Sequence, residues 1–180
     1  MVVGVARPHA TVSVPREEAT VLLAMDTSRS MKATDVNPTR LGSATAAAKA
    51  FLQKVPQTFR VGVVSFASRA VVAVPPTDDR SLVEAALSSL RAGEGTALGD
   101  AVSLSVRLGQ RERASDGTVP PTAVLLISDD LDEILSLSDR IAVIYRGRIS
   151  KALARKEVNI KELGLMMAGH GFGEGEAHAA

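Results

Sequence analysis

The sequence contains no cysteine and no tryptophan, and it has only one tyrosine and four phenylalanines among its 180 residues. The lack of cysteine excludes disulfide bonds, thiolate metal sites, iron–sulfur clusters and a cysteine nucleophile. Because single-stranded nucleic acids stack on aromatic side chains, the scarcity of these residues leaves little for that kind of binding. The 21 basic and 20 acidic residues give a net charge of +1, which provides no general attraction to nucleic acid or to an anionic membrane.

Long hydrophobic runs are also absent from the sequence. The longest runs, residues 20–25 and 123–127, have the length of a β-strand and fall far short of the roughly 20 residues that span a bilayer. Residues 1–15 lack the basic start and the apolar stretch of a signal peptide. We therefore expect a soluble chain without a membrane segment, cytoplasmic if it is expressed as it stands.

Hydrophobic residues make up 46% of the sequence, which is ordinary for a globular protein. Continuous or alternating apolar runs predict strands at residues 19–25, 60–66, 71–74, 123–128 and 140–145. Apolar residues at helical spacing predict helices at residues 40–54, 81–90, 97–109, 131–137 and 160–167. Residues 12–14 alternate weakly and form a further candidate edge strand, and residues 170–180 predict a flexible tail.

Strands and helices alternate through most of the chain, which is typical of a mostly parallel sheet with helices on both faces. Pro75 and Pro76 close the strand at residues 71–74, and this suits an edge position because proline cannot donate to a ladder. The sequence therefore predicts a three-layer α/β fold with a Rossmann-like, doubly wound and mostly parallel sheet that has one antiparallel edge strand. We expect a single domain over residues 1–169, since 180 residues are enough for one core.

Oxygen-bearing side chains gather where the predicted strands end. Asp26, Ser28 and Ser30 follow the first buried strand, Asp129 follows the strand at 123–128, and Thr96 lies on a glycine-flanked turn before a helix. Ligands of open α/β sheets bind beyond the carboxyl ends of the strands, where these side chains can converge. The set contains only oxygen donors, which favours a hard divalent cation such as Mg²⁺, or Mn²⁺ or Ca²⁺, over zinc.

Simpler interpretations of the same residues stay open. Asp26, Ser28 and Ser30 are also typical of a turn in which side chains cap backbone amides, and Thr96 is a candidate N-cap of the helix that follows it. An aspartate at a strand end beside cation ligands also occurs in aspartyl-phosphate chemistry. That enzymatic hypothesis is the weakest, because no second acid follows Asp26 closely and no lysine stands where it would steady a phosphoryl group.

Three segments carry a resemblance to a known family, namely residues 21–31 with Asp26-Thr27-Ser28-Arg29-Ser30, residues 95–101 with Thr96, and residues 125–129 ending at Asp129. Together they make residues 10–129 resemble a von Willebrand factor type A domain of the bacterial kind. The resemblance implies a metal-ion-dependent adhesion site of a non-catalytic module. Ser28, Ser30 and Thr96 would be the inner ligands, and Asp26 and Asp129 would act largely through water. A partner protein would supply an acidic side chain to the open coordination position.

The sequence departs from that family after Asp129, where Asp130 stands in place of a glycine that permits a positive φ angle. Residues 124–149 and 163–169 resemble the C-terminal end of ABC transporter ATP-binding domains, which implies a natural or designed chimera joined near residues 123–129. ATP binding is not expected, because the chain has no phosphate-binding G-x-x-x-x-G-K-[ST] motif. The alternative hypothesis is a structural chimera that retains no metal, ATP or partner binding.

Overall fold

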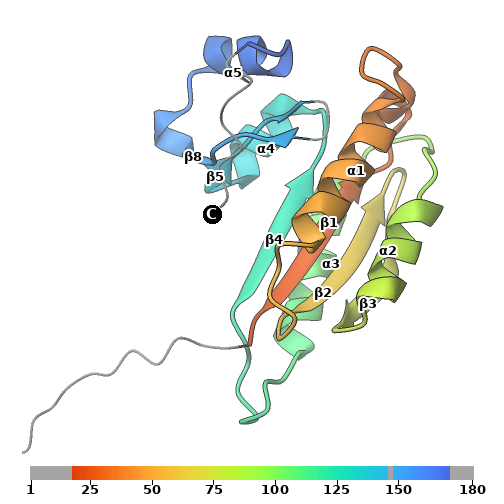
Figure 1. The fold of residues 1–180 in the computed structure, drawn as a ribbon, viewed down its shortest axis with the longest axis vertical. Helices are drawn as coiled ribbons and strands as arrows, with labels where there is room; N and C mark the ends of the chain where they lie inside the picture. Colours follow the sequence, from red (N-terminus) through yellow and green to blue (C-terminus); the bar gives the residue numbers. More distant parts are fainter. Residues whose placement is uncertain (1–17, 146–147, 171–180) are drawn as a thin grey trace, which may run out of the picture.

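The centre of the structure is a four-stranded sheet in the order β3-β2-β1-β4 (Figure 1). The computed structural model describes residues 18–145 and 148–170, so the candidate strand at residues 12–14 and most of the candidate tail lie outside the described residues. The strands are β1 (Thr20–Asp26), β2 (Arg60–Phe66), β3 (Ala70–Thr77) and β4 (Thr122–Ile127). β1 pairs in parallel with β2 and β4, whereas β3 is antiparallel to β2. The predicted fold class is therefore confirmed.

Three helices cover the two faces of this sheet (Figure 1). Helices α1 (Arg40–Leu52) and α2 (Arg80–Ser89) lie on one face, and α3 (Leu98–Arg111) lies on the other. Successive side chains of β1 point to opposite faces of the sheet, so the strand contributes to the core on both faces. Leu23 and Met25 pack with α1, while Ala24 packs with α3. The three helices start and end within three residues of their predicted bounds.

Helix α3 approaches β4 closely at a glycine. A Cβ atom on Gly109 would lie 2.3 Å from Cγ2 of Thr122, whereas a Cβ on Gly99 of the same helix would meet nothing within 4 Å. We expect Gly109→Ala to lower the free energy of unfolding by about 1–3 kcal/mol through overpacking. Gly99→Ala is the matched control and should raise it by up to about 1 kcal/mol, because alanine loses less entropy in a helix.

Urea denaturation of the two glycine variants beside the wild type measures both changes. Equal effects of the same sign would contradict the close contact between α3 and β4.

The segment after β4 differs from its predicted structure. Residues 140–145 do not form one strand of the main sheet but belong to two separate two-stranded sheets, β5 with β8 and β6 with β7. The apolar residues Ile141 and Val143 are buried against Leu163 in a small core of their own, which explains why they do not extend the main sheet. The elements here are α4 (Leu131–Leu137), β5 (Arg140–Ile141), β6 (Ile144–Tyr145), β7 (Arg148–Ile149), β8 (Leu153–Ala154) and α5 (Ile160–Met167).

Helices α4 and α5 have the predicted bounds, and Ile144 of β6 contacts the core on the α1 side of the main sheet. Two short 3₁₀ helices, η1 (Arg29–Lys32) and η2 (Arg155–Glu157), complete the fold. In the part of the chain that the structure describes, no helix combines the length and the apolar character needed to cross a bilayer.

Candidate metal centre

Asp26 is the last residue of β1, at the edge of the sheet where the parallel strands end, and it is only 1% exposed. The backbone N–H of Ser28 donates to Asp26 Oδ1 at 2.7 Å. The hydroxyl of Ser128, which follows β4, donates to Asp26 Oδ2 at 2.5 Å. These two bonds fix the carboxylate between the ends of the two parallel strands.

Ser28, Ser30 and Asp129 continue this network toward solvent. Ser28 Oγ lies 3.0 Å from Ser30 Oγ, and the Ser30 hydroxyl donates to Asp129 Oδ1 at 2.9 Å. Ser28 is buried, Ser30 is exposed in η1, and the side chain of Asp129 is 15% exposed. Four of the five predicted site residues therefore lie in one hydrogen-bonded group that links β1 to β4.

Thr96 is the predicted residue that this group does not include. It is exposed, and in residues 18–145 and 148–170 it makes no hydrogen bond to the other four. Its loop still lies beside them, because the N–H of Gly93 donates to the carbonyl of Thr27 at 2.6 Å. The N-cap of α3 is Ala97, so the alternative interpretation of Thr96 as a helix cap is wrong.

The glycine-flanked loop before α3 has a conformational requirement of its own. Gly95 has a φ angle of 82°, and a Cβ there would lie 2.9 Å from Cα of Ser68. Only glycine adopts this conformation without strain. An ion pair between the exposed side chains of Arg29 and Glu94, 3.8 Å apart, also joins this loop to η1.

Asp130, the residue that replaces the family's glycine, adopts an ordinary backbone conformation with φ −83° and ψ 100°. Its side chain accepts a hydrogen bond from the N–H of Glu133 at 3.0 Å and caps α4. Its own N–H donates to Ser128 Oγ at 3.1 Å. The turn after Asp129 therefore needs no positive φ angle. Aspartate fits at position 130 because it is the N-cap of α4.

Arg40 is a site residue that the sequence analysis missed. Its Nη1 donates to Asp129 Oδ2, and its Nε and Nη2 donate to the carboxylate of Asp35. These carboxylates raise the pKa of Arg40, and Arg40 in turn lowers the pKa of Asp35. Arg40 begins α1, 89 residues before Asp129, so no local pattern could have indicated this contact.

Glu133 in α4 is a second missed residue. Its Oε2 atom is buried without a hydrogen-bond partner, and its pKa is raised first by burial and then by the charges of Asp130 and Asp26. Ser128 is the third missed residue. It follows the end of β4 directly, as Asp26 ends β1, so the same reasoning could have predicted its hydroxyl. The missed residues therefore add one cationic side chain, Arg40, one acidic side chain, Glu133, and one hydroxyl, Ser128, to the site.

The pKa of Asp35 gives a direct check on the Arg40 contacts. We expect a value below the usual 3.8, because the guanidinium stabilises the carboxylate. A lowered pKa means that the ion pair contributes stability at neutral pH, and that this contribution is lost as the pH falls through the lowered value. Arg40→Gln should return the pKa of Asp35 toward 3.8 in a carboxyl-carbon NMR titration.

Asp79 is the internal control for this titration, because its pKa is lowered by Ser81 and not by Arg40. An unchanged pKa of Asp35 in the Arg40→Gln variant would contradict the ion pair.

The fold agrees with what comparison to known proteins finds. The profile of the von Willebrand factor type A domain matches residues 21–131, from the first residues of β1 to the start of α4. The chain belongs to this family. Von Willebrand factor type A domains are generally non-catalytic interaction modules.

Curated relatives support this membership. A UPF0353 protein from Mycobacterium ulcerans is 37% identical over 130 residues, which covers 71% of this chain and 39% of the relative. A UPF0353 protein from Nocardia farcinica is 38% identical over 137 residues, covering 72% of this chain and 39% of the relative. The chain thus spans about two fifths of the length of these relatives.

Solved structures share the von Willebrand factor type A fold. BatB from Bacteroides thetaiotaomicron aligns with a TM-score of 0.53 and 28% identity, over 60% of this chain and 52% of that one. The von Willebrand domain of the type V pili tip protein Mfa5 from Porphyromonas gingivalis aligns with a TM-score of 0.54 and 23% identity, over 63% and 38% of the two chains. The family match ends at residue 131, so the ABC-like origin of the following segment stays a prediction.

Proposed function

We propose that this chain is a protein-binding module that holds a divalent cation with Asp26, Ser28, Ser30, Thr96 and Asp129. The observation that carries the proposal is the hydrogen-bonded group in which Ser30 joins the Ser28 hydroxyl to Asp129, 99 residues away. Side-chain oxygens that lie within hydrogen-bond distance of one another are close enough to share one cation. The donor set also fits Mg²⁺ or Mn²⁺, which accept hydroxyl and carboxylate oxygens together with water.

The charge of the set indicates what the cation would do. The three hydroxyls are neutral and would contact the divalent cation directly, whereas Asp26 and Asp129 would act largely through water. The cation would therefore keep positive character toward its open side and attract a carboxylate of a partner protein. Among the described residues, no group of three or more His, Cys, Asp or Glu side chains is arranged to hold a metal. The proposed site therefore depends on its hydroxyls, which favours binding of an acidic partner over catalysis.

One observation favours the alternative function, a fold without metal binding. Arg40 already donates to Asp129 Oδ2, and both oxygens of Asp26 accept hydrogen bonds, so both carboxylates of the proposed site already have partners. In that case the chain is a structural chimera of the two predicted parts, with no retained metal, ATP or partner binding. A cation would have to compete with these internal partners.

Thermal unfolding with Mg²⁺, with Mn²⁺ and with EDTA distinguishes the two functions. A ligand that binds only the folded state raises its stability by about 2.7 kcal/mol at 100 times its dissociation constant. For a domain of this size we expect a rise in Tm of about 5–10 °C at that excess. Ser30→Ala should remove the rise, because it deletes the hydroxyl that joins Ser28 to Asp129.

Ser103→Ala is the matched control for Ser30→Ala, since Ser103 is an exposed serine of α3 away from the site. It should respond to the cations as the wild type does. An identical Tm with cation and with EDTA in the wild type would refute the metal site and support the structural alternative.

A further inference from the structure

β4 lies at the edge of the sheet, but its sequence has the apolar, uncharged character of a strand in the middle of a sheet. In residues 18–145 and 148–170, no strand pairs with its outer side. All seven residues of β1 are buried, whereas only Ile127 of β4 is, although β4 is equally apolar and carries no charged residue. Uncharged apolar runs of this kind are typical of strands paired on both sides within a parallel sheet.

The opposite edge of the sheet is protected in a way that β4 is not. β3 contains Pro75 and Pro76, and its pairing with β2 has two shifts of register. Prolines and irregular pairing are features that prevent another strand from adding to an edge. β4 contains neither proline nor charge, so one side of this sheet is closed and the other is suited to pairing.

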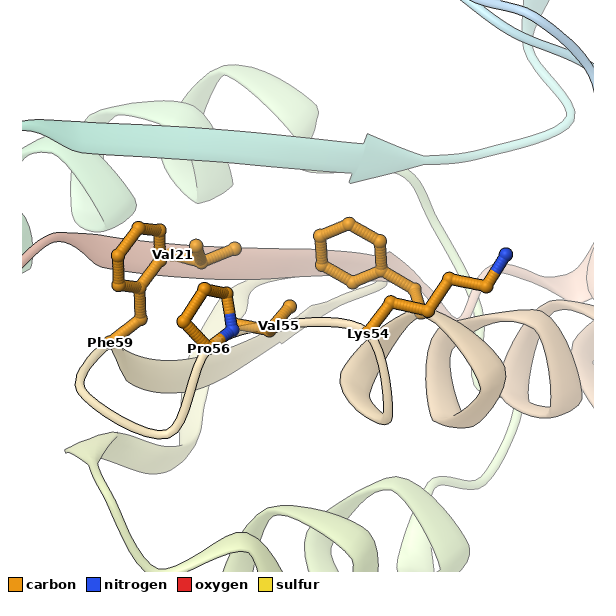
Figure 2. Close-up of a pocket in the computed structure, with 6 residues that line it drawn as sticks. Val21, Lys54, Val55, Pro56 and Phe59 are labelled. Carbon is orange, nitrogen blue, oxygen red and sulfur yellow. The ribbon is translucent and has the colours of Figure 1, made fainter. Parts of the chain in front are cut away.

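An apolar pocket lies on the same side of the sheet as α1. It has a volume of about 260 Å³, and Figure 2 shows its lining residues Val21, Phe51, Lys54, Val55, Pro56 and Phe59. Val21 is in register with Ala123 of β4, so the exposed side chain of Ala123 is on the pocket's side of the sheet. Ala123 and the pocket-lining Val21 therefore form an apolar surface that runs from the pocket to the base of β4.

The described chain begins beside this surface. Glu18 accepts a hydrogen bond from the N–H of Ser115 at 3.0 Å, and Thr20 N donates to the carbonyl of Pro121 at 2.9 Å. Pro121 immediately precedes β4, so the chain enters β1 at the base of β4. The 17 residues before this point include Thr11-Val12-Ser13-Val14, which alternates polar and apolar side chains.

We propose that residues 11–14 add to the free edge of β4 as an antiparallel strand, with Val12 and Val14 on the side of α1 and the pocket. Residues 15–18 are long enough for the connection, because four extended residues reach about 13 Å. The link has to cross two strand spacings, which amount to about 10 Å. The added strand satisfies the outer backbone groups of the β4 residues that it pairs with, and its two valines extend the apolar surface beside Ala123.

The absence of native cysteine makes disulfide cross-linking a clean test of this pairing. The full chain is prepared with Ala123→Cys combined in turn with Thr11→Cys, Val12→Cys, Ser13→Cys and Val14→Cys, and is oxidised with glutathione disulfide. Side chains on one face of a strand recur every second residue, and a disulfide needs Cα atoms about 4.4–6.8 Å apart. We expect an intramolecular cross-link, with the loss of two hydrogens by mass, from position 12 or position 14, whichever lies opposite Ala123, and none from 11 and 13.

Other outcomes of the cross-linking overturn the proposal. Equal yields at all four positions would mean that residues 11–14 do not pair with β4. Covalent dimers, formed also by Ala123→Cys alone, would mean that a second copy of the chain covers the edge. A cross-link at 11 or 13 alone would place the valines on the α3 side and overturn the assigned face.

Hydrogen exchange of the β4 amides in the full chain provides an independent readout without cysteine. Pairing predicts protection of the outward-pointing amides of Val124–Leu126 that Ser13→Pro removes and Ser13→Ala retains, because proline breaks a strand and alanine does not. The same exchange rates in both variants would overturn the proposal.

Discussion

Asp26→Ala should abolish any cation-dependent rise in Tm and also destabilise the protein in EDTA. The buried carboxylate accepts hydrogen bonds from the Ser28 N–H and the Ser128 hydroxyl, and the substitution leaves both donors without a partner. Leaving a buried donor unsatisfied costs about 1–3 kcal/mol, so we expect a total loss of about 2–4 kcal/mol. Urea denaturation in EDTA measures the second effect separately from the first.

Two variants keep this prediction interpretable. Asp78→Ala removes an exposed carboxylate at the far end of the sheet and should change stability by less than about 0.5 kcal/mol. Asp26→Asn keeps the size of the side chain, so it should fold even if Asp26→Ala does not. If Asp26→Asn shows the full wild-type rise in Tm with Mg²⁺, the cation binds elsewhere and the proposed site is wrong.

The sheet and its helices were largely predictable because their signals are local. Strand β2 and helices α4 and α5 have the predicted bounds, since each is marked by an apolar run or stripe between polar or proline-containing turns. Residues 140–145 show the limit of such signals. Isoleucine, valine and tyrosine favour any strand, and the sequence of a strand does not state which partner it pairs with.

The candidate site was partly predictable because one rule brings distant residues together. Asp26 and Asp129 each follow a strand of a parallel sheet, so the topology alone brings both to one edge. Arg40 escaped prediction because it lies at the start of a helix, and its contact with Asp129 depends on how α1 packs over the sheet. Thr96 was placed in the correct loop, but the conformation of a loop determines where a hydroxyl lies, and no motif specifies that distance.

Phe66→Ala should be the most destabilising single substitution in the sheet. The residue is fully buried at the end of β2 and packs with Ala24, Leu98 and Ala101 between the sheet and α3. Removing a buried phenylalanine ring costs about 3–5 kcal/mol, since the burial is lost and a cavity remains. Phe59→Ala is the matched control: that ring is only half-buried, so the cost in urea denaturation should be less than half as large.

The Phe66→Ala variant also distinguishes a loss of overall stability from a loss of cation binding. The carbonyl of Phe66 accepts hydrogen bonds from both the N–H and the hydroxyl of Thr27, at 2.8 and 2.9 Å, so its backbone holds the chain directly after Asp26. Phe66→Ala keeps this carbonyl and every side chain of the proposed site. We therefore expect a much lower Tm in EDTA but an undiminished rise on adding Mg²⁺, whereas Asp26→Ala loses the rise. Loss of the rise in both variants would mean that the cation response reports global stability and not binding at these oxygens.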